Sequence, residues 1–308
     1  MNISCSARKS WTVHISHWLD FYFSHAKIHS NFQFNYKDID YVFGTVDSET
    51  SQQPKQLWGG RVNNSLNLSK IDVYWLYDNG IGIKLPLSTK FISDDTYLKS
   101  KPLLKQYHRK GNAIITATDE LAKYIKEDFP DYQIEASCIQ DIVNTEKLEQ
   151  KVSLGLYDTI VLPIHMNDDI KFLEGIKDKE KIRLFLNVEC SYACPEKVCY
   201  GTTSKMNTGE KHEMMCSFWD FGMERTFYKD HINWGEFYFD KSKFDKIGIA
   251  KYKLIPPMEQ QQRTNTMYKK NRKLQEEYIK SEKRINATIA SFEKDINNSS
   301  GLPIPIKP

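Results

Sequence analysis

Short apolar runs alternate with longer polar segments over most of the chain. Six such runs stand out: IGIKLPL (81–87), AIITA (113–117), QIEASC (133–138), TIVLP (159–163), RLFLNV (183–188) and KYKLIP (251–256). Each of the first four is followed by a segment of helical periodicity, and a strand-like YVFG (41–44) precedes them all. This alternation predicts βαβ units in a parallel sheet. The nearly continuous apolar character of the runs predicts strands covered on both faces.

A closed barrel and an open doubly wound sheet both fit this alternation. No GxGxxG motif follows the first strand, which weakens the case for a dinucleotide-binding fold. We therefore predict an α/β fold, a TIM-like (β/α) barrel with some irregular or missing units, in which the six runs are parallel and adjacent in chain order. In the segment after AIITA, Thr118 or Asp119 is expected to cap a helix, and Pro130 lies just beyond its end.

Three regions are expected along the chain. Residues 1–37 carry aromatic and histidine residues without a clean period and predict an N-terminal extension. Residues 38–257 predict the barrel, and residues 258–308 a helical tail with a Pro-rich, disordered end. The stretch 251–284 holds ten Lys or Arg and four Glu, so it is basic. It reads either as a solvated helix face or as an element that binds RNA or a protein partner.

Composition narrows the class of protein only a little. The chain has 308 residues and is 40% apolar, enough for one large domain with a buried core. Its 43 basic and 40 acidic residues nearly balance, which neither indicates nor excludes a nucleic-acid binder. No window of about 18 apolar residues occurs, and the start lacks the apolar core of a secretory signal. We expect a cytoplasmic protein that does not enter the membrane.

The cysteines are clustered rather than numerous. Three of the six, Cys190, Cys194 and Cys199, lie in NVECSYACPEKVCY (187–200), and Cys216 follows. In a reducing compartment such clusters are more often metal-binding or catalytic than disulfide-bonded. Four thiolates suit an iron–sulfur cluster or zinc, and the spacing alone selects neither. Reduced structural cysteines are the alternative, although several unligated thiols in a polar loop would be prone to oxidation.

The position of these cysteines suggests a site. Cys190 follows RLFLNV, and substrate sites of parallel β/α folds lie at the carboxyl ends of the strands. Cys138 ends another run, and His165 follows TIVLP. If the strands close into a barrel, these groups converge on one mouth. His165 and Glu189 are the candidate acid–base residues by position.

Several motifs together resemble the collagenase-like peptidase family U32. They are LFLNVECSYACP (184–195), FDKIGIAKYKLIPP (244–257), NGIGIKL (79–85) and YDTIVLP (157–163), and the resemblance spans residues 40–257. The chain departs from the family pattern in the gap between Cys194 and Cys199. It also departs at Ile255-Pro256-Pro257, where the family has Glu-Gly-Arg.

The resemblance implies a TIM-like barrel with a 4Fe–4S cluster at its mouth, held by Cys190, Cys194, Cys199 and Cys216. Cys138 is the substitute for the fourth ligand. It also implies an iron–sulfur-dependent redox enzyme, such as an oxygen-independent hydroxylase or modifier of RNA bases or of a small aromatic molecule. The alternative is a zinc-stabilised barrel that binds nucleic acid or protein through its basic tail. A peptidase is a minor alternative, since the sequence contains neither HExxH nor GxSxG.

Overall fold

The computed structural model describes residues 10–15, 34–47, 57–58, 67–187, 198–215 and 238–255. The chain divides into two compact units, residues 1–262 and 263–308, and every described residue belongs to the first. Of the predicted cluster ligands, Cys190, Cys194 and Cys216 lie outside the described residues, as does Glu189. The predicted tail lies outside them too.

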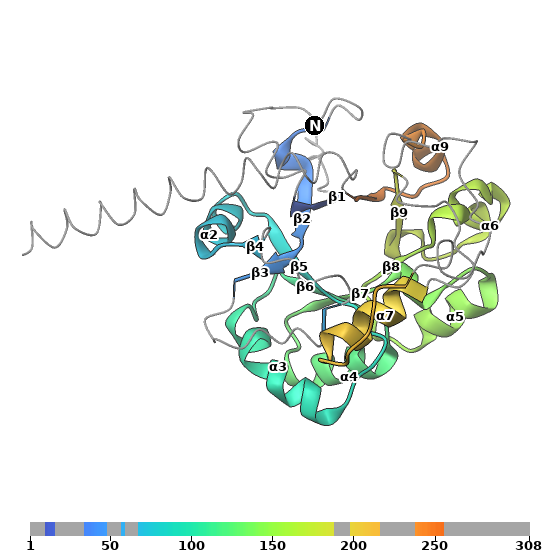
Figure 1. Cartoon of the computed structure of the whole chain (residues 1–308). Helices are drawn as coiled ribbons and strands as arrows, with labels where there is room; N and C mark the ends of the chain where they lie inside the picture. The colour runs from blue at the N-terminus through green and yellow to red at the C-terminus, as the bar shows by residue number, and fades with distance from the viewer. Residues whose placement is uncertain are drawn as a thin grey trace, which may run out of the picture. The chain divides into compact units, whose positions relative to one another are not determined.

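Eight parallel strands form a closed barrel (Figure 1). In order around the ring they are β1 (Trp11–His14), β2 (Ile39–Phe43), β5 (Gly82–Leu87), β6 (Ala113–Thr116), β7 (Gln133–Ala136), β8 (Thr159–Val161), β9 (Ile182–Phe185) and β10 (Lys251–Leu254). β10 pairs with β1 and closes the ring. The six predicted runs are therefore parallel neighbours in chain order, and the prediction of a TIM-like barrel is confirmed.

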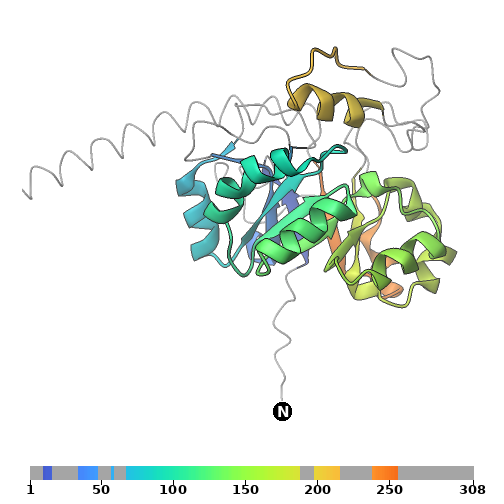
Figure 2. The ribbon, with the colours of Figure 1, turned by 90° about the horizontal axis from the view of Figure 1, so that it is seen from below.

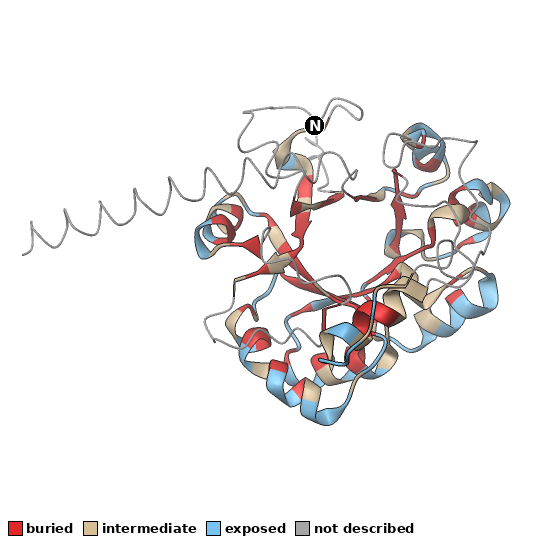
Figure 3. Ribbon diagram, viewed as in Figure 1, coloured by how far each residue is buried: buried red, intermediate tan, exposed pale blue. Residues whose placement is uncertain are grey.

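Helices α2 to α6 lie around the outside of the ring, with their buried faces toward the strands (Figures 1 and 3). The α-helices are α2 (Lys70–Asp78), α3 (Asp94–Gln106), α4 (Asp119–Asp128), α5 (Thr145–Ser153), α6 (Ile170–Gly175), α7 (Val198–Asn207) and α9 (Lys241–Lys246). The 3-10 helices are η1 (Tyr36–Asp38), η3 (Cys138–Gln140), η4 (Ile164–Asp168) and η5 (Lys179–Lys181). β3 (Thr45–Val46) and β4 (Asn67–Leu68) form a separate two-stranded parallel sheet.

Helix α4 shows how local sequence produces these elements. Thr118 is its N-cap, and its hydroxyl accepts a hydrogen bond from the backbone N–H of Leu121, as predicted. Leu121, Ala122 and Ile125 are buried on one face. This spacing of three and four residues forms the apolar stripe that packs against the barrel.

The first barrel strand was not predicted. β1 consists of the four residues WTVH and lies within the stretch 1–37 that was expected to be an extension. Four residues give too short a pattern to identify from periodicity. The strand is specified instead by its two neighbours, because β10 and β2 would both present open edges without it. Helices α2 and α7 were not predicted either.

The barrel interior is filled by side chains in layers, as in other (β/α) barrels. One layer comes from alternate strands of the ring: Thr12, Lys84, Glu135 and Arg183, from β1, β5, β7 and β9. The next layer toward the carboxyl ends is apolar, and its residues are Phe43, Ile115, Val161, Phe185 and Ile255. All of these side chains are buried. The interior of this barrel therefore has one polar and one apolar layer, although the sequences of its strands are mostly apolar.

Among the described residues, no helix is both long enough and apolar enough to cross a membrane.

Candidate functional site

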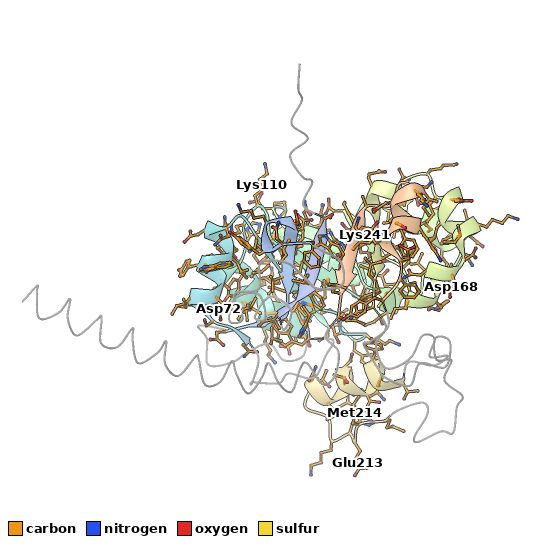
Figure 4. All side chains as sticks on the ribbon, turned by 90° about the horizontal axis from the view of Figure 1, so that it is seen from above. Asp72, Lys110, Asp168, Glu213, Met214 and Lys241 are labelled. Carbon is orange, nitrogen blue, oxygen red and sulfur yellow. The ribbon has the colours of Figure 1, made fainter. Side chains whose placement is uncertain are left out.

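The carboxyl ends of the barrel strands define one end of the barrel, which we call the mouth. Side-chain positions in Figure 4 separate the two ends: Lys110, which precedes β6, lies at one end, while Asp168, which follows β8, lies toward the other. Met214, beyond α7, lies on the same side as Asp168 (Figure 4). In parallel β/α folds substrates bind at this carboxyl end, so the mouth is where a functional site is expected.

The base of the mouth is the apolar layer of Phe43, Ile115, Val161, Phe185 and Ile255, which we call the apolar floor. These side chains are 0–9% exposed. They come from β2, β6, β8 and β9 and from the residue directly after β10, strands on different sides of the ring, so they meet across the barrel axis. Two phenylalanine rings in this layer give it the chemistry of a surface that packs against planar apolar groups.

Two side chains with reactive polar groups, those of His14 and Cys138, contact the apolar floor. His14 ends β1 and contacts the Phe43 ring edge-on, with 5.1 Å between ring centroids and 70° between ring planes. Because Thr12 faces the interior, the side-chain alternation of a strand places His14 on the same inner face. Cys138 follows β7 and packs, partly buried, against the floor. The floor is thus bordered by an imidazole and a thiol.

Below the floor lies a group of charged side chains, Lys84, Glu135, Arg183 and Lys253, which we call the charged layer. Glu135 is its centre: it accepts hydrogen bonds from the ammonium groups of Lys84 and of Lys253, the latter at 2.8 Å. Arg183 Nε lies 3.4 Å from Glu135 Oε2. All four residues are at most 5% exposed. One buried carboxylate therefore faces three buried cations.

A second carboxylate reaches this layer through an irregularity of β2. The pairing of β1 with β2 shifts register so that Trp11 pairs with Ile39 and Thr12 with Tyr41, which leaves Asp40 as an extra residue. A bulge of this kind redirects a side chain. Asp40 Oδ2 lies 3.6 Å from Arg183 Nη2, and its side chain is 28% exposed.

These contacts change the pKa values of the layer. Burial, reinforced by the nearby Arg183, lowers the pKa of Lys84 to about 7. Burial alone would raise the pKa of Glu135, but the ammonium groups of Lys253 and Lys84 outweigh it and hold that pKa well below its usual range. Glu135 is therefore ionised at any ordinary pH, while Lys84 titrates near neutrality.

Lys253 joins the charged layer to the floor. Its ammonium group lies 4.7 Å from the centroid of the Phe43 ring and 5.6 Å from that of Phe185. Both distances are within the range of cation–π attraction. The same ammonium group binds Glu135, so the positive charge nearest the mouth is fixed in place by the layer beneath.

Two asparagines make hydrogen bonds to the backbone at the mouth of the barrel. Asn187, fully buried after β9, donates from its amide to the carbonyl of Ile255 and accepts from the N–H of Ile255. It thereby extends the pairing of β9 with β10 beyond both strands. Asn167, in η4, donates to the carbonyl of Phe185 at 2.7 Å. Its Oδ1 is buried and has no hydrogen-bond partner within the described part of the chain.

Helix α7 is attached at the mouth. The backbone N–H of Lys90, just after β5, donates to the Ser204 hydroxyl at 3.1 Å, and Asn207 donates to the carbonyl of Trp58 at 2.8 Å. Figure 2 shows α7 beyond one end of the barrel. Cys199 lies in the first turn of this helix and is partly buried. The predicted cysteine loop therefore gives way to a helix at Val198, before its last cysteine.

The structure tests the predicted site residues only in part. His165 lies in η4 at the mouth and is partly buried, and Cys138 lies against the floor. Cys199 lies on α7, and the remaining cluster candidates fall outside the described residues. Within the described ranges, no three His, Cys, Asp or Glu side chains group as metal ligands. The four-cysteine site thus stays a prediction.

Sequence reasoning missed His14 and the charged layer. A signal for the charged layer was present, since Lys84, Glu135, Arg183 and Lys253 each lie in one of the six apolar runs. A lone charge in a strand covered on both faces must be buried, and buried charges need partners. Only the register of the barrel shows that these four are partners.

The chain was compared with known proteins. No protein-family model matches it, and no curated protein matches it. Among solved structures it is similar to the U32 peptidase Mk0906, with 13% identity, a TM-score of 0.49, and coverage of 83% of this chain and 96% of that chain. A likeness at this identity transfers neither activity nor residue roles to this chain.

Proposed function

We propose that the chain is an iron–sulfur-dependent redox enzyme whose site is the barrel mouth. We further propose that its substrate presents a planar aromatic ring, either an RNA base or a small aromatic molecule, and that the reaction is an oxidative modification such as hydroxylation. The observation that carries the proposal is the apolar floor, with the Phe43 and Phe185 rings and the thiol of Cys138 at the carboxyl end of a (β/α) barrel.

The donor set suits the cofactor. Cys190, Cys194, Cys199 and Cys216 would hold the cluster, with Cys138 as the substitute fourth ligand, and thiolates are the usual ligands of iron–sulfur clusters. Two of these five, Cys138 and Cys199, are described, and both belong to elements attached at the mouth. A bound cluster would carry electrons between the substrate at the mouth and an external redox partner.

The chain's own residues would bind and orient the substrate. The rings of Phe43 and Phe185 would pack against an aromatic ring, a contact worth about 0.5–1.5 kcal/mol beyond the burial of its area. Asn167 Oδ1, a buried acceptor without a partner among the described residues, would accept a hydrogen bond from an N–H or O–H of the substrate. His14 and His165 are the candidates to move a proton at the mouth.

Anaerobic purification of the full chain tests the cofactor. Iron, sulfide and zinc should be quantified together, and the absorption spectrum recorded. We expect iron and sulfide in equal amounts with a brown colour. Cys199→Ser should lower both while the circular dichroism of the helices is retained. Cys5→Ser is the matched control, because Cys5 is remote from the cluster in sequence, and it should leave the metal content unchanged.

The same measurement separates the alternatives. Zinc without sulfide would contradict the redox proposal and support a zinc-stabilised barrel that binds nucleic acid or protein. The pair Cys138→Ser and Cys216→Ser identifies the fourth ligand, since only the ligand's variant should lose iron. A protein that holds no metal after anaerobic reconstitution, and whose Cys199→Ser variant behaves like the wild type, would remove the basis for the proposal.

A further inference from the structure

The charged layer contains more positive than negative charge. Lys84, Arg183 and Lys253 are cations, and Glu135 and Asp40 are the carboxylates that contact them. Tyr41, a further titratable group against this layer, lies under the Lys84 ammonium at 4.3 Å and stays neutral, because burial and Asp40 raise its pKa. With all three cations protonated, the layer holds one positive charge in excess.

An excess charge in a buried position is costly unless a counter-charge approaches it. The buried carboxylate of Glu135 already accepts hydrogen bonds from both Lys84 and Lys253, and it also lies 3.4 Å from Arg183. It therefore cannot neutralise all three cations. Arg183 Nε is buried and makes no hydrogen bond within the described part of the chain. Asp40 is partly exposed, so solvent weakens its contribution.

One of the three cations, Lys253, lies on the side of the layer that faces the mouth. The Lys253 ammonium group contacts the rings of Phe43 and Phe185, and both rings are part of the floor. A cation against one side of an aromatic ring draws electron density toward itself. The opposite side of the ring then repels negative charge less. The field of the cation also extends through a medium of low dielectric constant.

From this arrangement we infer that the mouth is an anion-selecting site: its ligand carries a negatively charged group, and that group balances the excess cation of the charged layer. The inference rests on the proposed function only in placing the ligand at the mouth. The shared chemistry is a carboxylate or phosphate group attached to, or near, a planar ring.

The affinity for an anion should depend on pH. Burial and Arg183 lower the pKa of Lys84 to about 7, so raising the pH through neutrality removes the proton of Lys84 and with it the excess charge. Glu135 keeps its charge over this range because its pKa is lowered, and arginine does not deprotonate in proteins. A bound anion would in turn favour protonated Lys84.

Benzoate and benzamide test the inference, because they match in shape and differ in charge. Binding to the full-length protein should be followed through the ring signals of isotope-labelled histidines, with His14→Gln to assign the signal of His14. At about pH 6 we expect benzoate to bind at least about fivefold more tightly than benzamide, and at about pH 8 the ratio should fall toward one. The His14 signal should shift, since His14 contacts the floor.

Lys253→Met should abolish the preference for benzoate while retaining the apolar contacts of the lysine stem. Lys99→Met is the matched control: it removes the same charge from an exposed pair with Asp95 on α3 and should preserve the preference. If Lys253→Met fails to fold, the pH dependence of the wild type decides. Equal binding of the two probes at about pH 6, no shift of the His14 signal, or a preference independent of pH would each overturn the inference. Metal content is measured separately, so its outcome does not decide this one.

Discussion

Gly82 allows a close approach between two backbone segments at the amino-terminal end of the barrel. A Cβ atom at this position would lie 2.0 Å from the carbonyl oxygen of Gly111 and 2.8 Å from the Tyr41 ring. The Gly111 oxygen belongs to the backbone and cannot rotate away. Only glycine therefore fits at the start of β5, for reasons of space rather than of backbone angle.

Gly82→Ala should lower the free energy of unfolding by about 1–3 kcal/mol, because β5 must shift to admit the methyl group. Chemical denaturation measures the change. Gly175→Ala is the matched control: a methyl group added there would meet no atom within 4 Å, and the residue ends α6, where alanine is favourable. Equal stabilities of the two variants would show that the strand accommodates the methyl group freely.

Lys84 should make stability depend on pH. Its pKa is about 7 in the folded protein against an ordinary lysine value of 10.5, so between these values the unfolded chain binds more protons. Stability should therefore rise with pH above about 7, by at most about 1.4 kcal/mol per pH unit. Lys84→Met should flatten this rise, measured as thermal unfolding over that pH range. Lys99→Met, an exposed lysine, should keep it, and parallel profiles for wild type and Lys84→Met would contradict the burial argument.

At the scale of elements, β9 and β10 are joined beyond their ends by one side chain. Asn187 both donates to and accepts from the backbone of Ile255, so it acts as an additional rung of the sheet. The residue is fully buried, and solvent cannot replace either bond. An asparagine at the end of a strand thus positions Ile255, which belongs to the floor.

Asn187→Ala should cost about 1–3 kcal/mol of stability, because it removes both hydrogen bonds that this side chain makes to the buried backbone of Ile255. Urea denaturation provides the measurement. Asn187→Asp keeps the acceptor but sets a carboxylate against the Ile255 carbonyl, so it should be at least as destabilising as alanine. An Asn187→Ala variant as stable as the wild type would mean that another group bonds the Ile255 backbone.

At the scale of the whole molecule, the barrel should be independent of the second unit. The described residues, including all eight strands, belong to the unit 1–262. A chain truncated after Gln262 should therefore retain the far-ultraviolet circular dichroism of an α/β protein, a cooperative unfolding transition and the metal content of the full chain. An insoluble or metal-free product would place part of the core or site beyond residue 262.

RNA binding by the truncated chain decides the role of the basic residues after the barrel. If these residues bind RNA, removing them should weaken RNA affinity most at low salt, because contacts to phosphate release counterions. An RNA affinity that is unchanged and insensitive to salt would assign them to a solvated surface instead.

The sequence by itself determined the architecture. Apolar runs separated by helical segments predict parallel strands with crossover helices because both patterns arise from local geometry, period two or continuous for strands and 3.6 for helices. Thr118 illustrates the same point for a boundary, since a cap depends only on residues within one turn. The cysteine cluster is also evident from sequence alone, as a concentration of one residue type.

Tertiary structure decided everything that depends on closure of the ring. β1 is a strand because β10 and β2 flank it, which four residues of sequence do not reveal. His14 becomes a mouth residue only through that strand. Lys84 and Lys253 lie 169 positions apart in the chain, yet both contact Glu135. The alternation of side chains along β5 and β10 turns both lysines into the barrel, and the register of the strands places them at the height of Glu135. Long-range register has no local signature, and this is why the charged layer and the floor above it emerged only from the fold.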